Sequence, residues 1–115
     1  MKYVMFVVGD PDHTEEDEAA APDIEDWFAY VRGKGAYLSG VRLQSTDDAT
    51  TVKVRGGELL VTDGPFTESK EWIAGFAMLE CADLDEAIEI ASRNPMAFHG
   101  RLELRPVHSM GGPDD

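Results

Sequence analysis

The chain has 115 residues, of which 43% are hydrophobic, and this length suits one domain with a single core. Ten Lys and Arg residues stand against 23 Asp and Glu, a net charge of -13 that would repel phosphate backbones and anionic membranes alike. We therefore expect no nucleic-acid partner and no membrane partner.

The first expected strand, residues 3–8, is apolar at every position, which is typical of a central strand covered on both faces. The run is far too short for a signal-peptide core or a membrane span. The single cysteine, Cys81, allows no disulfide within the chain and lies in an apolar run, so we interpret it as a buried hydrophobe. Together these features predict a cytoplasmic protein.

Residues 10–23 are rich in acids and read as a solvated loop with a frayed helical turn. They contain His13, whose protonated form the surrounding carboxylates would favour. This histidine can be interpreted either as an exposed loop residue or as a site residue on a flap. Asp23 then has the chemistry of an N-cap, and a helix follows up to Gly33. Its apolar stripe has helical spacing and comprises Ile24, Trp27, Phe28 and Val31.

A second strand is expected from residue 37 to 44, and a β-hairpin from 51 to 61 around Gly56-Gly57. Residues 73–81 look like a second central strand. Asp83 begins another helix, which Asn94-Pro95 ends, and residues 96–100 form a loop. The predicted buried stripe of this helix is Leu84, Ala87, Ile88 and Ala91.

The closing strand alternates over residues 102–105 and completes a single domain, residues 1–108, followed by a disordered tail, 109–115. The element order predicts an α+β fold, a ferredoxin-like split βαβ antiparallel sheet with an inserted β-hairpin. Two helices cover only one face of such a sheet. We expect a second copy to cover the other face, which makes the protein a homodimer.

The two central parts of the chain meet at a corner, Asp63-Gly64-Pro65-Phe66, preceded by Val61-Thr62 and followed by Lys70-Glu71. This corner resembles the signature of the YCII-related family, DGPF subgroup. Three other segments extend the resemblance, in the right order: Met1–Met5, Asp83–Ala87 and Leu102–Val107.

The resemblance implies a ferredoxin-like fold that pairs as a dimeric α+β barrel, and an association with alternative sigma factors of the extracytoplasmic-function type. Some members of the family are thought to use a His-Asp pair whose histidine lies near the first helix. This chain has Asp23, Ile24 and Glu25 in that region, and only His13 is at all close. The dyad therefore does not carry over residue by residue.

No phosphate loop, dinucleotide fingerprint, zinc spacing or nucleophile elbow occurs in the sequence, and we predict neither a metal nor a cofactor. The predicted site is a polar pocket at the corner, with Asp63 as candidate general acid or base. Its candidate ligand-binding residues are Arg42, Gly64, Pro65, Phe66, Lys70 and His99. Three functions stay open: a small-ligand-binding or regulatory module, a small enzyme that uses Asp63, and a structural dimer module.

Overall fold

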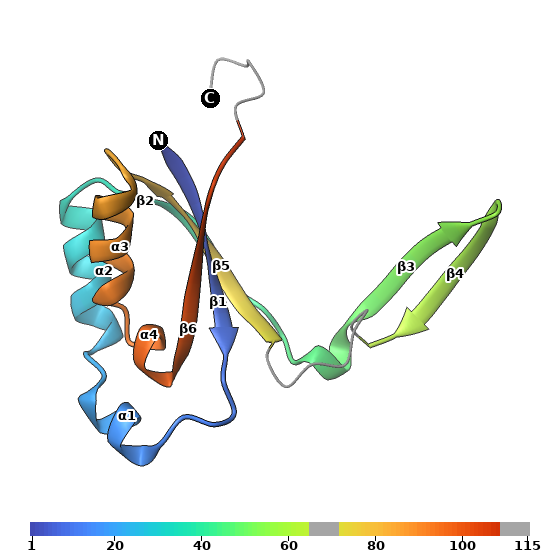
Figure 1. Cartoon of the computed structure of the whole chain (residues 1–115), viewed down its shortest axis with the longest axis horizontal. Coiled ribbons are helices and arrows are strands. Elements are labelled where there is room, and N and C mark those ends of the chain that lie inside the picture. The colour runs from blue at the N-terminus through green and yellow to red at the C-terminus, as the bar shows by residue number, and fades with distance from the viewer. Residues whose placement is uncertain (65–71, 109–115) are drawn as a thin grey trace.

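The main sheet has four antiparallel strands in the order β2-β5-β1-β6 (Figure 1). The computed structural model describes residues 1–64 and 72–108, so the predicted tail lies outside the described residues. The strands are β1 (Lys2–Gly9), β2 (Tyr37–Arg42), β5 (Trp72–Glu80) and β6 (Gly100–Pro106). The two runs without polar alternation, in β1 and β5, occupy the centre of the sheet. The predicted α+β class and antiparallel sheet are confirmed, and the strand order is consistent with a ferredoxin-like fold.

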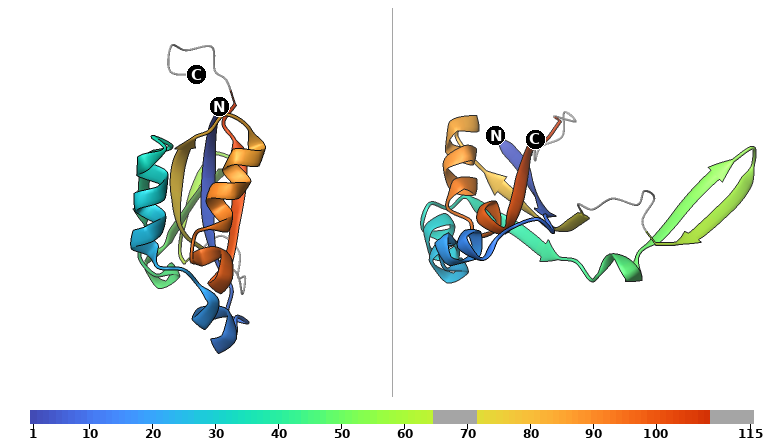
Figure 2. Two further views of the ribbon diagram at one scale, coloured as in Figure 1. Left: turned by 90° about the vertical axis from the view of Figure 1, so that its left-hand side faces the viewer. Right: turned by 60° about the horizontal axis from the view of Figure 1, so that its bottom comes forward.

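The α-helices in the described residues all lie on one face of this sheet (Figures 1 and 2). The two long ones are α2 (Ile24–Gly33) and α3 (Leu84–Ser92). Asp23 caps α2 by accepting from the Glu25 N–H at 2.9 Å, and Asp83 caps α3 through the Glu86 N–H at 2.9 Å, as predicted. In the described part of the chain, no helix has the length and apolar character that crossing a bilayer would need.

Two short helices replace predicted loops. The acidic segment forms α1 (Glu15–Ala20) rather than a frayed turn, because Thr14 and Asp17 complete a capping box. The segment after Pro95 forms α4 (Met96–His99), where the Asn94 side chain accepts from the Met96 N–H at 2.8 Å. In both cases a local side-chain acceptor satisfies backbone donors that a loop would leave to water.

The core lies between the sheet and helices α2 and α3. Met5 and Leu79 from the central strands and Val31 and Ile90 from the helices are its fully buried large side chains. Trp27, also buried, donates its indole N–H to the backbone carbonyl of Ile90 at 2.8 Å and so links α2 to α3. The predicted stripe of α2 is thus confirmed for Trp27 and Val31, whereas Ile24 stays partly exposed.

The predicted buried stripe of α3 is wrong in part. Leu84 and Ile88 are 49% and 50% exposed, and the buried face consists of Ala87, Ile90 and Ala91. The apolar arc of α3 is wider than the face that the sheet and α2 can cover. The bond from Trp27 to the Ile90 carbonyl fixes which side of that arc turns inward.

The inserted hairpin is a separate two-stranded sheet that projects from the domain (Figure 1). It consists of β3 (Thr50–Arg55) and β4 (Glu58–Asp63), with the 3-10 turn η1 (Thr46–Asp48) before it. Gly56 and Gly57 have φ angles of 58° and 79°, which is the geometry of a tight hairpin turn. The predicted hairpin and its turn are confirmed.

The other face of the main sheet carries apolar side chains and no helix. Because Tyr3 and Met5 are buried under the helices, Val4 and Phe6 point to the opposite side. The register pairs Phe6 with Phe76 and Phe76 with Val41 on this side, and Phe76 and Val41 are 37% and 51% exposed. We call this surface the open face; it comprises Val4, Phe6, Val41, Phe76 and Met78.

Two isoleucines on α3 test the packing. Ile90→Ala should lower the free energy of unfolding by about 2–5 kcal/mol, because it leaves a cavity in a packed core. Ile88→Ala should cost less than about 1 kcal/mol, because half of the side chain is in water and alanine favours the helix. Urea unfolding of both variants measures the difference, and equal losses would contradict the observed helix orientation.

The open face generates a second prediction. We expect a second copy of the chain to cover it, because an apolar sheet face of this kind is unfavourable in water. Sedimentation equilibrium should then give about twice the 12.6 kDa of one chain. A monomer at micromolar concentration would rule the homodimer out.

Candidate functional site

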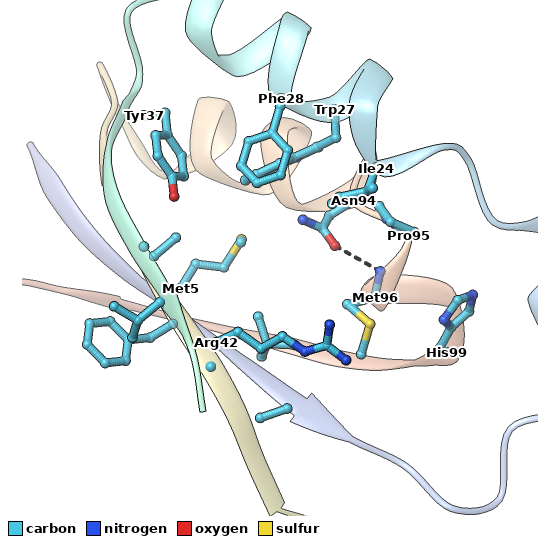
Figure 3. A pocket seen from close by; sticks show the side chains of 17 residues that line it. Met5, Ile24, Trp27, Phe28, Tyr37, Arg42, Asn94, Pro95, Met96 and His99 are labelled. Atoms are coloured by element: carbon cyan, nitrogen blue, oxygen red, sulfur yellow. Dashed lines mark hydrogen bonds between the residues drawn. The ribbon is translucent and has the colours of Figure 1, made fainter. Parts of the chain in front are cut away.

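A cavity of about 520 Å³ lies between the helices and the sheet (Figure 3). Strands β1, β2 and β5 form its floor, α2 forms one wall, and the segment from the end of α3 to α4 forms the other. Its walls are mainly apolar and include Met5, Ile24, Trp27, Phe28 and Met96. The volume falls within the range of about 300–1,000 Å³ that is typical of small-molecule sites. We call it the helix–sheet cavity.

Three aromatic rings at one end of the cavity hold one another in edge-to-face contact. The ring of Phe28 lies 5.2 Å from Trp27 and 5.5 Å from Tyr37, with interplanar angles of 69° and 82°. Arg32 stacks on the outer side of this cluster, 4.7 Å from the Phe28 ring centroid. A Cβ atom on Gly40 would clash with the Tyr37 hydroxyl, so this glycine makes room for the ring. The aromatic wall is therefore fixed by its own packing.

Arg42 brings a positive charge into these apolar surroundings. It ends β2, and Figure 3 shows its guanidinium reaching across the cavity toward Met96. Within residues 1–64 and 72–108, no carboxylate forms an ion pair with it. The strands around it lie close together, since a side chain on Gly75 would collide with the Val41 carbonyl. A guanidinium without an acidic partner in a concave apolar site attracts an anion.

Asn94 supplies a second polar group. The residue is only 3% exposed, and its side-chain oxygen is occupied by the Met96 N–H. Figure 3 shows the amide nitrogen on the opposite side, turned toward the cavity. Because its oxygen already accepts from the Met96 N–H, the groups that Asn94 most readily offers a ligand are the two N–H donors of its amide.

His99 closes the far end of the cavity. Its Nε2 atom is buried and finds no hydrogen-bond partner among residues 1–64 and 72–108. The ring stacks on His13, with centroids 5.9 Å apart and an interplanar angle of 27°. A buried ring nitrogen without a partner is costly.

His13 is held by two acceptors. Its Nδ1 lies 2.9 Å from the Asp10 carbonyl oxygen, and its Nε2 lies 2.7 Å from Glu18 Oε1. Since a carbonyl and a carboxylate can only accept, both ring nitrogens donate, and the geometry is that of an imidazolium. The carbonyl of Asp10 and the carboxylate of Glu18 accordingly raise the pKa of His13 above its ordinary value. His13 contacts His99 but does not line the cavity, and its role as a site residue on a flap stays a prediction.

The sequence-predicted site residues divide into three groups. Arg42 and His99 both line the helix–sheet cavity. Asp63 and Gly64 lie at the base of the hairpin and do not line it. The remaining three, Pro65, Phe66 and Lys70, lie outside the described residues.

The corner residues that are described close the base of the hairpin. Asp63 ends β4 opposite Thr50 and is exposed. Gly64, with a φ of 97°, donates its N–H to the Ala49 carbonyl at 2.7 Å, and its own carbonyl accepts from the Thr51 hydroxyl at 2.8 Å. The acid–base role of Asp63 stays a prediction.

Sequence reasoning missed Tyr37 and Asn94. The sequence pattern predicts only a helix-stopping role for Asn94 with Pro95, although an asparagine before a new turn is also a capping signal. Among residues 1–64 and 72–108, no group of three or more His, Cys, Asp or Glu side chains could hold a metal ion.

The two hydrogen bonds of His13 generate a pH prediction. A raised pKa means that its contribution to stability is fully present below about 6.5 and is lost as the pH rises through the higher folded value. Glu18→Gln should lower the pKa of His13, measured from its ring-proton NMR shifts. Glu16→Gln is the matched control, because it removes the same charge from α1 and leaves both bonds intact. Equal effects of the two variants would show that the bond to Glu18 does not raise the pKa of His13.

Two comparisons with known proteins bear on this chain. Residues 1–111 match the family model of the YCII-related domain. An uncharacterized protein from Rhizobium meliloti (strain 1021) is 37% identical over 97 residues, which cover 81% of this chain and 77% of that protein. The family match agrees with the sheet, the helix caps and the sequence segments described above. The chain therefore belongs to the YCII-related domain family.

Proposed function

We propose that this protein binds a small organic anion, an apolar or aromatic body with a carboxylate, in the helix–sheet cavity. The observation that carries the proposal is Arg42, a guanidinium without a described acidic partner in a cavity with apolar walls. Low local polarity strengthens an ion pair formed there, compared with the same pair in water.

The polar groups of the cavity are mainly donors. Arg42 offers a planar fork of N–H groups, and Asn94 offers its amide nitrogen. A carboxylate is the complementary group, because its two oxygens accept in parallel from a guanidinium. The net charge of -13 makes nonspecific anion binding elsewhere on the surface unfavourable, so this cation would select the site.

The apolar walls define the rest of the ligand. Phe28 and Trp27 present packed aromatic surfaces, and Met5 and Met96 can adjust to the shape of a ligand body. The volume of about 520 Å³ suits a molecule of one or two rings rather than a peptide or a nucleotide.

A ligand-binding module also fits a regulatory role, which the sigma-factor association implied by the resemblance would require. This association and the finer assignment to the DGPF subgroup stay predictions. For the enzyme alternative, Asp63 does not line the cavity, so its support is the corner motif alone. The structural dimer alternative gives no role to Arg42, for which the described residues supply no acidic partner.

The test is a thermal-shift and calorimetric panel of benzoate, phenylacetate and indole-3-acetate against their neutral amides. At a concentration ten times Kd, a carboxylate should raise Tm by about 5 °C. Arg42→Met should weaken binding by about 10- to 100-fold, because it removes charge-assisted hydrogen bonds and keeps the apolar stem.

Arg55→Met is the matched control, since it removes the same charge from the hairpin and should leave affinity unchanged. Asp63→Asn in the same assay tests whether the Asp63 corner contributes to ligand binding. A loss of affinity would show that it does, and unchanged affinity would show that it does not. Equal binding of amides and carboxylates, or full affinity in Arg42→Met, would disprove the proposal.

A further inference from the structure

The hairpin has one wholly apolar face at its centre. We call residues Thr50–Asp63, which form β3 and β4, the arm. The antiparallel register places Val52 opposite Val61 and Val54 opposite Leu59, so these four side chains share one face. Each of them is between 56% and 64% exposed. The opposite face mixes polar and apolar side chains, of which Thr62 is exposed and the other three are partly buried: Thr51, Lys53, Leu60 and Thr62.

The backbone of the arm is fixed at both ends, but its apolar side chains are exposed. The two-glycine turn fixes its tip, and the bonds from Gly64 to Ala49 and from Thr51 to Gly64 fix its base. It pairs with no strand of the main sheet. A two-stranded hairpin alone is marginally stable in water, and four adjacent aliphatic side chains on its surface are unfavourable there. The apolar face therefore needs a partner surface.

The position of the arm indicates where that partner lies. The arm extends on the side of the main sheet that carries no helices (Figures 1 and 2). The open face borders the same space. It also holds a groove of about 260 Å³ with Phe6, Val8 and Trp72 along its floor and Arg101 and Arg105 at its rim. A body seated on the open face would lie beside the arm.

Charge selects a second copy of this chain as that body. The arm carries two cations, Lys53 and Arg55, and two acids, Glu58 and Asp63, so it is neutral within a chain of net charge -13. The rim of the groove, with Arg101, Glu103 and Arg105, is net positive. The arm and the groove are thus two regions of a strongly acidic chain whose own charges do not repel another acidic copy.

We propose that the apolar face of the arm packs against the second copy that covers the open face, so that each protomer of a twofold dimer holds the other with its arm. The proposal rests on the homodimer expected above and is independent of the ligand. A twofold interface uses the same patch on both protomers, so each arm residue enters it twice.

The test introduces one charge on either face of the arm. Val54→Asp places a carboxylate on the apolar face of the arm. Thr62→Asp places one on the opposite face of the arm. Sedimentation velocity between 0.1 and 100 µM should show a dimer Kd raised by about 100-fold for Val54→Asp. The reason is that a twofold interface would bury two unpaired carboxylates, one from each protomer. Thr62→Asp should change Kd by less than about threefold.

Hydrogen exchange of the wild-type arm provides a second measurement that needs no variant. Its amides should exchange more slowly as the protein concentration rises through Kd. A wild-type dimer whose Kd is the same in Val54→Asp, or whose arm exchanges at the same rate at all concentrations, would overturn the role of the arm and leave the dimer intact. A wild-type monomer at 100 µM would overturn both and leave the surface to a different protein.

Discussion

The contact on which the structure depends most is the hydrogen bond from the Trp27 indole to the Ile90 carbonyl. It is buried, it joins α2 to α3, and it sets how these helices lie over the sheet. The same indole packs edge-to-face against Phe28 and lies 6.2 Å from the Tyr37 ring. The same residues therefore pack the helices together and line the cavity, so a shift of the helices would also move the cavity wall.

This arrangement gives the two faces of the sheet different roles. On the covered face, the helices close over the core at one end and leave the helix–sheet cavity at the other, where small residues such as Gly40 and Gly75 keep the strands close. On the open face, the alternating side chains of the same strands point away from every helix. Ligand binding and subunit contact would thus use opposite faces of the same four strands.

Charge placement follows the same division. Acids fill the exposed surfaces of α1, α2 and α3, where they also stabilise helix N-termini. Three of the ten cations line the two concave surfaces, with Arg42 in the cavity and Arg101 and Arg105 at the groove. His13 connects the acidic segment to a residue that lines the cavity, because its ring stacks on His99 while Glu18 and Asp10 hold it.

The sequence by itself determined the features that depend on neighbours along the chain. Continuous apolar runs identified the two central strands, the Gly56-Gly57 pair identified the hairpin, and Asp23 and Asp83 identified the helix starts, because each of these signals acts within a few residues. Only the tertiary structure decided which side of α3 is buried, that Arg42 and Asn94 face one cavity, and that His99 meets His13. These are contacts between segments far apart in the chain, and their side chains carry no local signal of their partners. The packing of α2 on α3 and on the sheet selects these contacts. A wide apolar arc or a lone polar residue is compatible with several orientations until the whole core is assembled.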